Sequence, residues 1–555
     1  MGKQLVKEMI TRDENHPSII FWSNGNEGGF NYELEPDFAF WDKQKRVVLY
    51  PWANRNGFET KHYRSYGETQ EYMRQKEIFM PTEFLHGLYD GGHGAGLKDY
   101  WDMMMANPRC AGGFLWDLMD QGVVRTDKNN YVDCMGNFGA DGIVGPHAEK
   151  EGSYYTIKEV WCPVQLTWND VEKGELTLSN QYNFVNLKDC RFSYRLLQMP
   201  AMGSTQVKVL KQGNLSSPDV APGKEAQVKI PMMANADAVE IKAVNHEGEE
   251  IMTWSRGVKS EERRVKNSSA PSTSSAAYAD QADAVEVKAG GRTYRFAKKD
   301  GRLMGVEVGS KAISLSNGPR FMAARRSDRS LDQFYNHDDK EAEKKKTLYT
   351  EFVDQGAFAG FEWKEAEAKL VATYQHGSLD EVDWQFLSDG SVAVTCHYNF
   401  GGVVDMMGMA FDYPESKVRS KAWVGNGPYR VWQNREQGPQ YGYWQNDYND
   451  PIPAESWDYP EFKGYFANVK WMQFKTDEGK IGFSGLTADE HMGVYTPRDG
   501  RDGLLYTLPQ TGLAVFKVIP SVRNKVNTTD LNGPSALPKW LNGKGKTVFT
   551  LNFEL

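Results

Sequence analysis

The chain has 555 residues, more than one hydrophobic core normally supports, and we therefore expect two to four domains. Its formal net charge of -9 predicts neither the basic surface of a nucleic-acid-binding protein nor a polybasic membrane-binding face. No apolar run approaches the ~20 residues of a membrane span, and the N-terminus lacks the apolar core of a signal peptide. The sequence as given predicts a soluble protein of unknown compartment, and it is compatible with a periplasmic or secreted parent protein.

The first 160 residues alternate short apolar runs with helical stretches, the pattern of repeated β–α units around a parallel sheet. Five runs are expected to be strands: residues 18–23, 46–52, 57–63, 77–84 and 110–118. Residues 96–108 place Leu97, Tyr100, Trp101 and Met104 at helical spacing, which predicts a helix that packs on this sheet. Residues 1–160 are therefore expected to form one parallel α/β domain.

After residue 160 the pattern changes to alternating strands broken by turn residues. Residues 161–258 predict a β-sandwich of roughly a hundred residues. Residues 259–284 are rich in serine, alanine and charged side chains, and they predict a linker. Residues 285–555 predict a large β-sandwich of many short strands, in which the charged run 338–346 is expected to be a solvated loop.

Two glutamates follow expected strands of the parallel region. Glu27 follows the strand 18–23 through a turn, and Glu83 lies near the end of the strand 77–84. In a parallel barrel the strand ends meet at one face, so acids far apart in sequence come together there. Hydrolysis of a glycosidic bond with retention needs two carboxyl groups about 5–5.5 Å apart. Taken alone, however, a glutamate after a strand is more often a rim acid or part of a helix start.

The residues around both glutamates resemble glycoside hydrolase family 2, the family of bacterial β-galactosidases. RDENHPSIIFWSNGNEGG resembles the family's acid/base signature, and PTEFLHG with GGFLWDLMDQG resembles its nucleophile region and the strand after it. The two motifs occur in the family's order, 56 residues apart (83 - 27). The resemblance implies that Glu27 is the general acid/base and Glu83 the nucleophile.

The same resemblance implies substrate-binding roles for Asn26, Tyr63, His86 and Trp116. Asn26 matches an asparagine that binds the sugar 2-hydroxyl, and Tyr63 matches a tyrosine that touches the nucleophile. His86 matches a sugar-binding histidine, and Trp116 matches the aromatic floor of the subsite. The alternatives are ordinary core packing for Tyr63 and Trp116 and a loop histidine for His86.

The resemblance continues downstream and implies the architecture. NFGADGIVGPH and YYTIKEVWCPVQL resemble the passage from the barrel to the family's second immunoglobulin-like domain. FAKKDGRLMGVEVGSKAI and WVGNGPYRVWQNR resemble the large C-terminal sandwich of the long β-galactosidases, which can lean over the active-site mouth. The implied fold is a partial (β/α)8 TIM barrel of the C-terminal five strands (1–160), an immunoglobulin-like sandwich (161–258) and the large sandwich (285–555).

The chain also departs from the family pattern, because the acid/base motif begins at Arg12 and the first three barrel strands are expected to be absent. Five strands cannot close a barrel, and an open edge favours association with another chain or copy. Three explanations stay open: a truncated sequence, which we prefer, one piece of an enzyme completed by an N-terminal chain, or a remnant that binds sugar without cleaving it.

The family's magnesium-binding acid and histidine lie on the missing strands, so the metal ligands stay unknown. The chemistry requires no cofactor, and Mg or Na would lack some of its ligands in this chain. We expect a retaining exo-β-glycosidase, foremost a β-galactosidase, that acts on an oligosaccharide or glycoside by double displacement. A β-glucuronidase or β-mannosidase and a non-catalytic carbohydrate-binding fragment are the alternatives.

Overall fold

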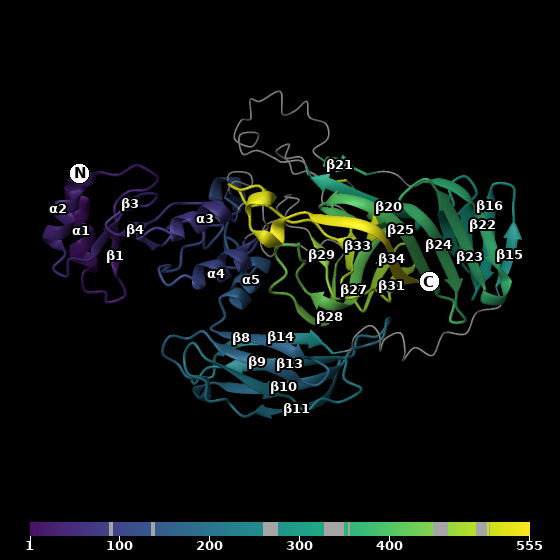
Figure 1. Ribbon diagram of the computed structural model, residues 1–555, viewed down its shortest axis with the longest axis horizontal. Coiled ribbons are helices and arrows are strands. Elements are labelled where there is room, and N and C mark those ends of the chain that lie inside the picture. The colour runs from purple at the N-terminus through teal and green to yellow at the C-terminus, as the bar shows by residue number, and fades with distance from the viewer. Residues whose placement is uncertain are drawn as a thin grey trace, which may run out of the picture.

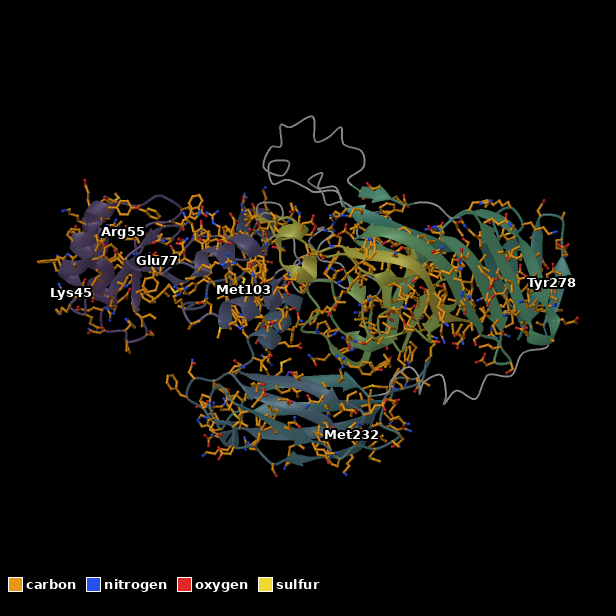
Figure 2. All side chains as sticks on the ribbon, in the orientation of Figure 1. Lys45, Arg55, Glu77, Met103, Met232 and Tyr278 are labelled. Atoms are coloured by element: carbon orange, nitrogen blue, oxygen red, sulfur yellow. The ribbon has the colours of Figure 1, made fainter. Side chains whose placement is uncertain are left out.

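The computed structural model describes residues 1–87, 93–134, 139–258, 276–326, 349–352, 356–447, 464–495, 508–509 and 511–555. Figure 1 shows three parts: an N-terminal part of helices and short strands, a β-sandwich below it, and a large β-sandwich that ends the chain in green and yellow. Figure 2 marks Met103 in the first part, Met232 in the second and Tyr278 at the far end of the third. None of the described helices combines the length and the apolar character that a membrane crossing requires.

The N-terminal part contains five described α-helices between short strands. The helices are α1 (Gly2–Asp13), α2 (Glu35–Trp41), α3 (Tyr66–Met73), α4 (Leu97–Met105) and α5 (Gly152–Val160). The strands are β1 (Phe21–Ser23), β2 (Val47–Leu49), β3 (Asn54–Arg55), β4 (Phe58–Glu59), β5 (Ile78–Phe79), β6 (Val123–Arg125) and β7 (Tyr131–Asp133). Helix α4 confirms the predicted helix, since Leu97, Tyr100 and Met104 are buried in a cluster with Phe79 and Phe84.

The parallel pairings of this part follow chain order, and we call them the parallel row, although β1-β2 and β3-β4-β5 are separate sheets and β3 pairs with β4, and β6 with β7, in antiparallel fashion. β1 pairs with β2 and β4 pairs with β5, both in parallel, and single parallel bridges join Phe79 to Cys110, Phe84 to Leu115 and Met119 to Val144. Four of the five expected strands are present in shortened form, whereas residues 110–118 contribute only isolated bridges. Gly112 explains the interruption, because its φ of +90° is not a strand conformation. Within the described residues β1 pairs only with β2.

The middle part is a sandwich of two antiparallel sheets. One sheet has the order β11-β10-β13-β14 and the other the order β12-β9-β8. Strand β9 alternates half-buried and buried residues, which places Leu176 and Leu178 in the core between the sheets. The strands are β8 (Val164–Asp170), β9 (Glu175–Asn180), β10 (Arg191–Gln198), β11 (Lys208–Leu215), β12 (Glu225–Lys229), β13 (Ala238–Val244) and β14 (Glu250–Gly257).

The C-terminal part is a sandwich of two larger sheets. In the described residues one sheet runs β15-β16-β17-β18-β20-β26-β33-β32-β29, with β19 beside β18 and β21 beside β20, and the other runs β22-β23-β24-β25-β34-β31-β30-β27-β28. Strands of the first sheet are β15 (Ala277–Asp280), β16 (Ala284–Ala289), β17 (Arg292–Ala297), β18 (Leu303–Val308), β19 (Lys311–Ile313), β20 (Ser316–Arg326), β21 (Tyr349–Glu351), β26 (Met406–Asp412), β29 (Tyr465–Phe466), β32 (His491–Val494) and β33 (Leu513–Val518). Strands of the second are β22 (Ala357–Lys364), β23 (Lys369–Gln375), β24 (Leu379–Phe386), β25 (Val392–Val404), β27 (Val418–Gly427), β28 (Gln440–Asp447), β30 (Trp471–Thr476), β31 (Lys480–Ser484) and β34 (Lys539–Glu554).

One boundary differs from the sequence-based expectation. Residues 277–280 fall in the stretch predicted as linker, but they form β15, the edge strand of the first large sheet. The local composition is poor in apolar residues, and the strand gains its packing from Tyr278, which stacks on Trp363 with ring centroids 5.5 Å apart. Linker residues 259–275 and the charged run 338–346 lie outside the described residues.

Candidate active site

The two glutamates lie after neighbouring parts of the parallel row. After β1 the Asn24 backbone amide donates to the Leu49 carbonyl (2.9 Å). The turn that follows is closed by the Gly29 amide, which donates to the Asn26 carbonyl (2.8 Å), and Glu27 lies within it. Glu83 follows β5 and directly precedes Phe84, which forms the bridge to Leu115. The Glu27 side chain is 47% exposed and that of Glu83 is 13% exposed, so the first meets solvent and the second is largely enclosed.

His62 lies between the two carboxylates. Its Nδ1 atom is 3.1 Å from Glu27 Oε1 and 3.5 Å from Glu83 Oε2, and its side chain is 1% exposed. One side-chain atom from each of the three residues lies within 4.8 Å of the others, so the two carboxyl groups approach each other closely. On the opposite edge of the ring, His62 Nε2 is 2.8 Å from Thr82 Oγ1.

Tyr63 contacts Glu83 through both its backbone and its side chain. Its amide donates to the Glu83 carbonyl (3.2 Å), and its phenol donates to Glu83 Oε2. Burial, followed by the Glu83 carboxylate, raises the pKa of Tyr63, so the phenol remains a donor. Glu27 and Tyr63 have φ of +45° and +51°, and non-glycine residues in this strained region concentrate at functional sites.

Aromatic rings line the site in a row that begins at Trp52. Ring centroids are 6.5 Å apart for Trp52 and His62, 5.5 Å for His62 and Tyr63, 5.4 Å for Tyr63 and His86, and 6.4 Å for His86 and Trp116. Such a wall offers flat apolar faces next to hydrogen-bonding groups, the combination that suits a pyranose ring.

His86 and Trp116 meet Asp141, an acid that the sequence did not single out. Trp116 Nε1 donates to Asp141 Oδ2 (3.1 Å), and His86 Nε2 lies 3.7 Å from the same oxygen. Burial raises the pKa of Asp141. Burial and the Asp141 charge also raise the pKa of neighbouring Asp117, to about 7.

The large sandwich supplies Lys525 to this group. Lys525 Nζ lies 3.2 Å from His86 Nε2, although the two residues are 439 positions apart in the chain. Burial and then the Lys525 charge lower the pKa of His86 well below its ordinary value, so the imidazole is neutral. An ammonium can only donate, and His86 Nε2 therefore accepts from it.

Lys525 belongs to the segment 519–538, which connects β33 to β34. Within it, Asn527 Nδ2 donates to the Tyr63 carbonyl (3.2 Å), which holds the backbone of the residue that contacts Glu83. Further along, the Ser535 amide and hydroxyl both donate to Asp99 Oδ2 on α4 (2.8 and 2.6 Å). The segment is thus attached to the N-terminal part at the site itself and at a helix beside it.

The structure brings five of the six residues named from the sequence into one site: Glu27, Tyr63, Glu83, His86 and Trp116. The sixth, Asn26, lies on the exposed turn before Glu27, and its side chain has no hydrogen bond to another described residue. Sequence reasoning missed His62, Asp141 and Lys525 as site residues. For His62 a signal existed, since it directly precedes Tyr63 at the end of an expected strand, but nothing local marks Lys525.

A cation could be held by two groups in the described part of the chain: Glu27 with His62 and Glu83, and Glu381 with Asp383 and His397. The first group would occupy both glutamates with metal ligation, which conflicts with acid and nucleophile roles. The second lies on the large sandwich, away from the aromatic row.

Three family models match the chain in succession. "Glycosyl hydrolases family 2, TIM barrel domain" matches residues 2–143, "Beta-galactosidase, domain 4" matches residues 176–253, and "Beta galactosidase small chain" matches residues 288–514. Together these matches run from the N-terminal part through the middle sandwich into the large one.

Curated relatives agree with the family models. A β-galactosidase of Oenococcus oeni is 21% identical over an alignment that takes in 97% of this chain and 56% of the relative. A β-galactosidase of Priestia megaterium is 29% identical over 33% of this chain and 19% of the relative. Among solved structures, an exo-chitosanase of Amycolatopsis orientalis aligns with 71% of this chain and 52% of its own at 11% identity and a TM-score of 0.24.

The chain therefore spans little more than half the length of the curated relatives it matches. Its three successive family matches and its alignment with a β-galactosidase over nearly all its length agree with the motifs around Glu27 and Glu83. The chain belongs to glycoside hydrolase family 2.

Proposed function

We propose that the protein is a retaining exo-β-glycosidase, foremost a β-galactosidase, that removes terminal β-linked sugars by double displacement. The approach of the Glu27 and Glu83 side chains to within 4.8 Å of each other carries the proposal. Retention requires carboxyl groups about 5–5.5 Å apart, whereas inversion leaves about 6.5–9.5 Å for a water molecule. The relatives named β-galactosidase favour galactosides among the candidate substrates.

The unequal environments of the two glutamates suit two roles. Glu83 is largely enclosed and accepts from the Tyr63 phenol, a contact that fixes the position of the nucleophile. Glu83 attacks the anomeric carbon while Glu27 protonates the leaving oxygen. Glu27, which is about half exposed, then takes a proton from water as that water releases the sugar from Glu83.

His62 acts in this scheme as a positioning residue for the Glu27 proton. The Thr82 hydroxyl donates to the Thr60 carbonyl (3.2 Å), so it accepts from His62 Nε2–H. In the neutral imidazole the Nδ1 lone pair then faces Glu27 Oε1 at 3.1 Å, and the hydrogen bond between them needs a proton on Glu27. The tautomer set by Thr82 therefore fixes which ring atom meets Glu27, and this contact holds the Glu27 carboxyl in place before the first step.

The sugar subsite would be built from Trp116, His86, Asn26 and Lys525. Trp116 offers its indole face, while Lys525 and Asn26 offer donors to sugar hydroxyls. Magnesium or sodium held by Glu27, His62 and Glu83 would occupy both acids that this scheme needs for the reaction.

The same proposal covers the architecture. Residues 1–160 would be the C-terminal five strands of a TIM barrel, residues 161–258 an immunoglobulin-like sandwich, and residues 285–555 the large sandwich of β-galactosidases. The outer edge of β1, unpaired within the described residues, would pair with a complementing N-terminal chain or another copy. Light scattering with and without a separately expressed N-terminal half of a relative measures that association.

The assignment is tested with a 2-fluoro galactoside, which accumulates a covalent glycosyl-enzyme because its release is slow. We expect mass spectrometry to find the label on the peptide that contains Glu83, and labelling at another residue would refute the nucleophile assignment. Glu83→Gln and Glu27→Gln should each lower turnover of a nitrophenyl galactoside by roughly 10² or more. Glu33→Gln, on the exposed turn Tyr32–Leu34, is the matched control.

A panel of nitrophenyl glycosides ranks the substrates. Turnover of glucuronides or mannosides without galactosides would replace the β-galactosidase reading by β-glucuronidase or β-mannosidase. Sugar binding without turnover by the purified chain would favour a non-catalytic carbohydrate-binding fragment.

A further inference from the structure

Two adjoining cavities lie where the three parts of the molecule meet. One has a volume of about 270 Å³ and the other about 490 Å³, and Arg256, Asn426 and Asn468 line both. Their walls come from α5, from β8 and β14 of the middle sandwich, and from β27 and the segment before β28 of the large one. In Figure 1 this place lies between the lower sandwich and the strands β27 and β28 above it. We call the pair the junction cavities.

Hydrogen bonds between the parts hold these walls in place. The Gly438 amide donates to Glu159 Oε2 on α5 (2.6 Å), and Thr156 Oγ1 donates to the Gln437 carbonyl (2.9 Å). The Ser255 amide donates to Gln440 Oε1 (2.8 Å), and the Ser255 hydroxyl to the Tyr441 carbonyl (2.6 Å). Because all three parts are tied together around the cavities, the space is preformed and does not depend on a moving loop.

The walls carry polar groups whose bonding capacity the protein leaves unused. Within the described residues, neither the Arg256 guanidinium nor the Glu436 carboxylate has a hydrogen bond or ion pair. The side-chain amides of Asn426 and Asn468 also make no hydrogen bond to a described residue. The cavities therefore present the guanidinium donors of Arg256, the carboxylate acceptor of Glu436 and two asparagine amides that both donate and accept hydrogen bonds.

Two indoles complete the lining of the smaller cavity. Trp168 is half-buried and Trp254 is 8% exposed, and both rest on the core of the middle sandwich. In the described part of the chain neither indole N–H has a hydrogen-bond partner. Fixed aromatic faces beside amides, a carboxylate and a guanidinium are the surroundings that bind the C–H faces and the hydroxyls of a sugar together.

Charge and polarity exclude the other small ligands. The Arg256 charge acts on the carboxyl groups of Glu159 and Glu436, and the Lys539 charge also acts on Glu436. Two cations beside two carboxylates give a phosphate or sulfate no net attraction. An apolar ligand would bury the unpaired polar groups at a cost of about 1–3 kcal/mol each. A neutral ligand with many hydroxyls avoids both costs, and the volumes approach or fall within the range of roughly 300–1,000 Å³ usual for small-molecule sites.

We propose that the junction cavities are a second, non-catalytic binding site for a neutral pyranose sugar of one or two rings. This site is separate from Glu27 and Glu83, and it does not depend on the proposed hydrolysis. Arg256, Asn426 and Asn468 bind the hydroxyls from the boundary between the cavities, and Trp168 and Trp254 face the ring.

The test uses the full chain with 5-fluorotryptophan and follows fluorine resonances by NMR. Trp168→Phe and Trp116→Phe identify the resonances that report the junction cavities and the candidate active site. The probes are methyl 1-thio-β-galactopyranoside, its glucose epimer and inorganic phosphate, each up to about 10 mM, which detects a Kd near 1 mM. We expect a thioglycoside to shift the Trp168 resonance in a saturable way, in the wild type and equally in Glu83→Gln.

Arg256→Gln should weaken this response about tenfold, the effect of losing one hydrogen bond to a charged group. Arg191→Gln is the matched control, because Arg191 is exposed on β10 of the same sheet and does not line the cavities. Both variants replace exposed side chains, and thermal melts verify that they fold. Asn426→Ala gives a second weakened variant on the opposite wall.

Three results would overturn the proposal: a Trp168 resonance that neither thioglycoside moves, equal responses in Arg256→Gln and Arg191→Gln, or a response to phosphate alone. The Trp116 resonance and glycoside turnover are read in the same samples. A failed active-site proposal would change those two readouts and leave the Trp168 response intact, so the two failures are distinguishable.

Discussion

Lys525→Met should raise the pKa of His86. The substitution removes the ammonium 3.2 Å from His86 Nε2 and keeps most of the side-chain length. At an effective dielectric constant of about 20, a unit charge at that distance opposes protonation of the imidazole by about 5 kcal/mol. Without it, a protonated His86 would instead gain an ion pair with Asp141, whose Oδ2 lies 3.7 Å away. Burial still opposes the charge, so the pKa rises from its lowered value by less than the Coulomb energy alone implies.

The assay is an NMR pH titration of the chain labelled with 13C at its ten histidines. His86→Gln assigns the resonance, and Lys544→Met, an exposed lysine on β34, is the control. In the wild type His86 stays neutral while the unfolded chain takes up a proton, so stability is lost as pH falls below about 6.5. Lys525→Met should reduce that loss. An unchanged His86 titration in a folded variant would show that burial alone lowers its pKa, and would refute the role given to Lys525.

Three further predictions concern single residues. Burial raises the pKa of Glu151 to about 9, so above pH 4.5 the unfolded chain loses the proton that the folded chain keeps, and the free energy of unfolding falls as pH rises toward 9. Glu151→Gln lacks this loss and should gain about 5 kcal/mol over wild type between pH 4.5 and pH 8 in calorimetry, whereas parallel curves would contradict this. Burial lowers the pKa of His93 to about 4, so below pH 6.5 the unfolded chain binds a proton that the folded chain does not. The free energy of unfolding of wild type, measured with urea, should therefore fall by about 3 kcal/mol between pH 6.5 and pH 4, whereas His93→Gln should not show this fall. His62→Phe should lower kcat for a nitrophenyl galactoside with KM little changed, because the Glu27 carboxyl loses the imidazole that positions it. Thr82→Val should lower kcat more weakly, and an unchanged kcat in both variants would remove the positioning role.

The candidate acids and their aromatic neighbours could be located from the sequence because each belongs to a short motif beside a strand. Helix α4 was predictable for a similar reason: its buried residues repeat at helical spacing within nine residues. In both cases the information is local. The residues around both glutamates also lie in or next to short apolar runs between turns, and such runs form the strands of a parallel sheet.

The rest of the site depends on contacts that no local pattern encodes. Lys525 reaches His86 only because the segment 519–538 docks on α4, and that docking involves the Ser535–Asp99 bonds far from either motif. Strand β15 was missed for the same reason, because its stability comes from Tyr278 against Trp363 on another sheet. The strand expected at residues 110–118 does not form as a continuous strand, because the positive φ of Gly112 interrupts a run whose apolar pattern alone predicted a strand.

The segment that carries Lys525 begins and ends in central strands of two different sheets. β33 lies between β26 and β32 in one sheet, and β34 lies between β25 and β31 in the other. Any change in the spacing of these sheets therefore displaces the segment at both ends, together with Lys525 and Asn527. Phe516 and Phe549 are fully buried on these two strands, so substitutions there should shift the segment and alter the site from a distance. A random mutational screen for altered sugar preference should accordingly recover substitutions deep inside the large sandwich as well as around the glutamates.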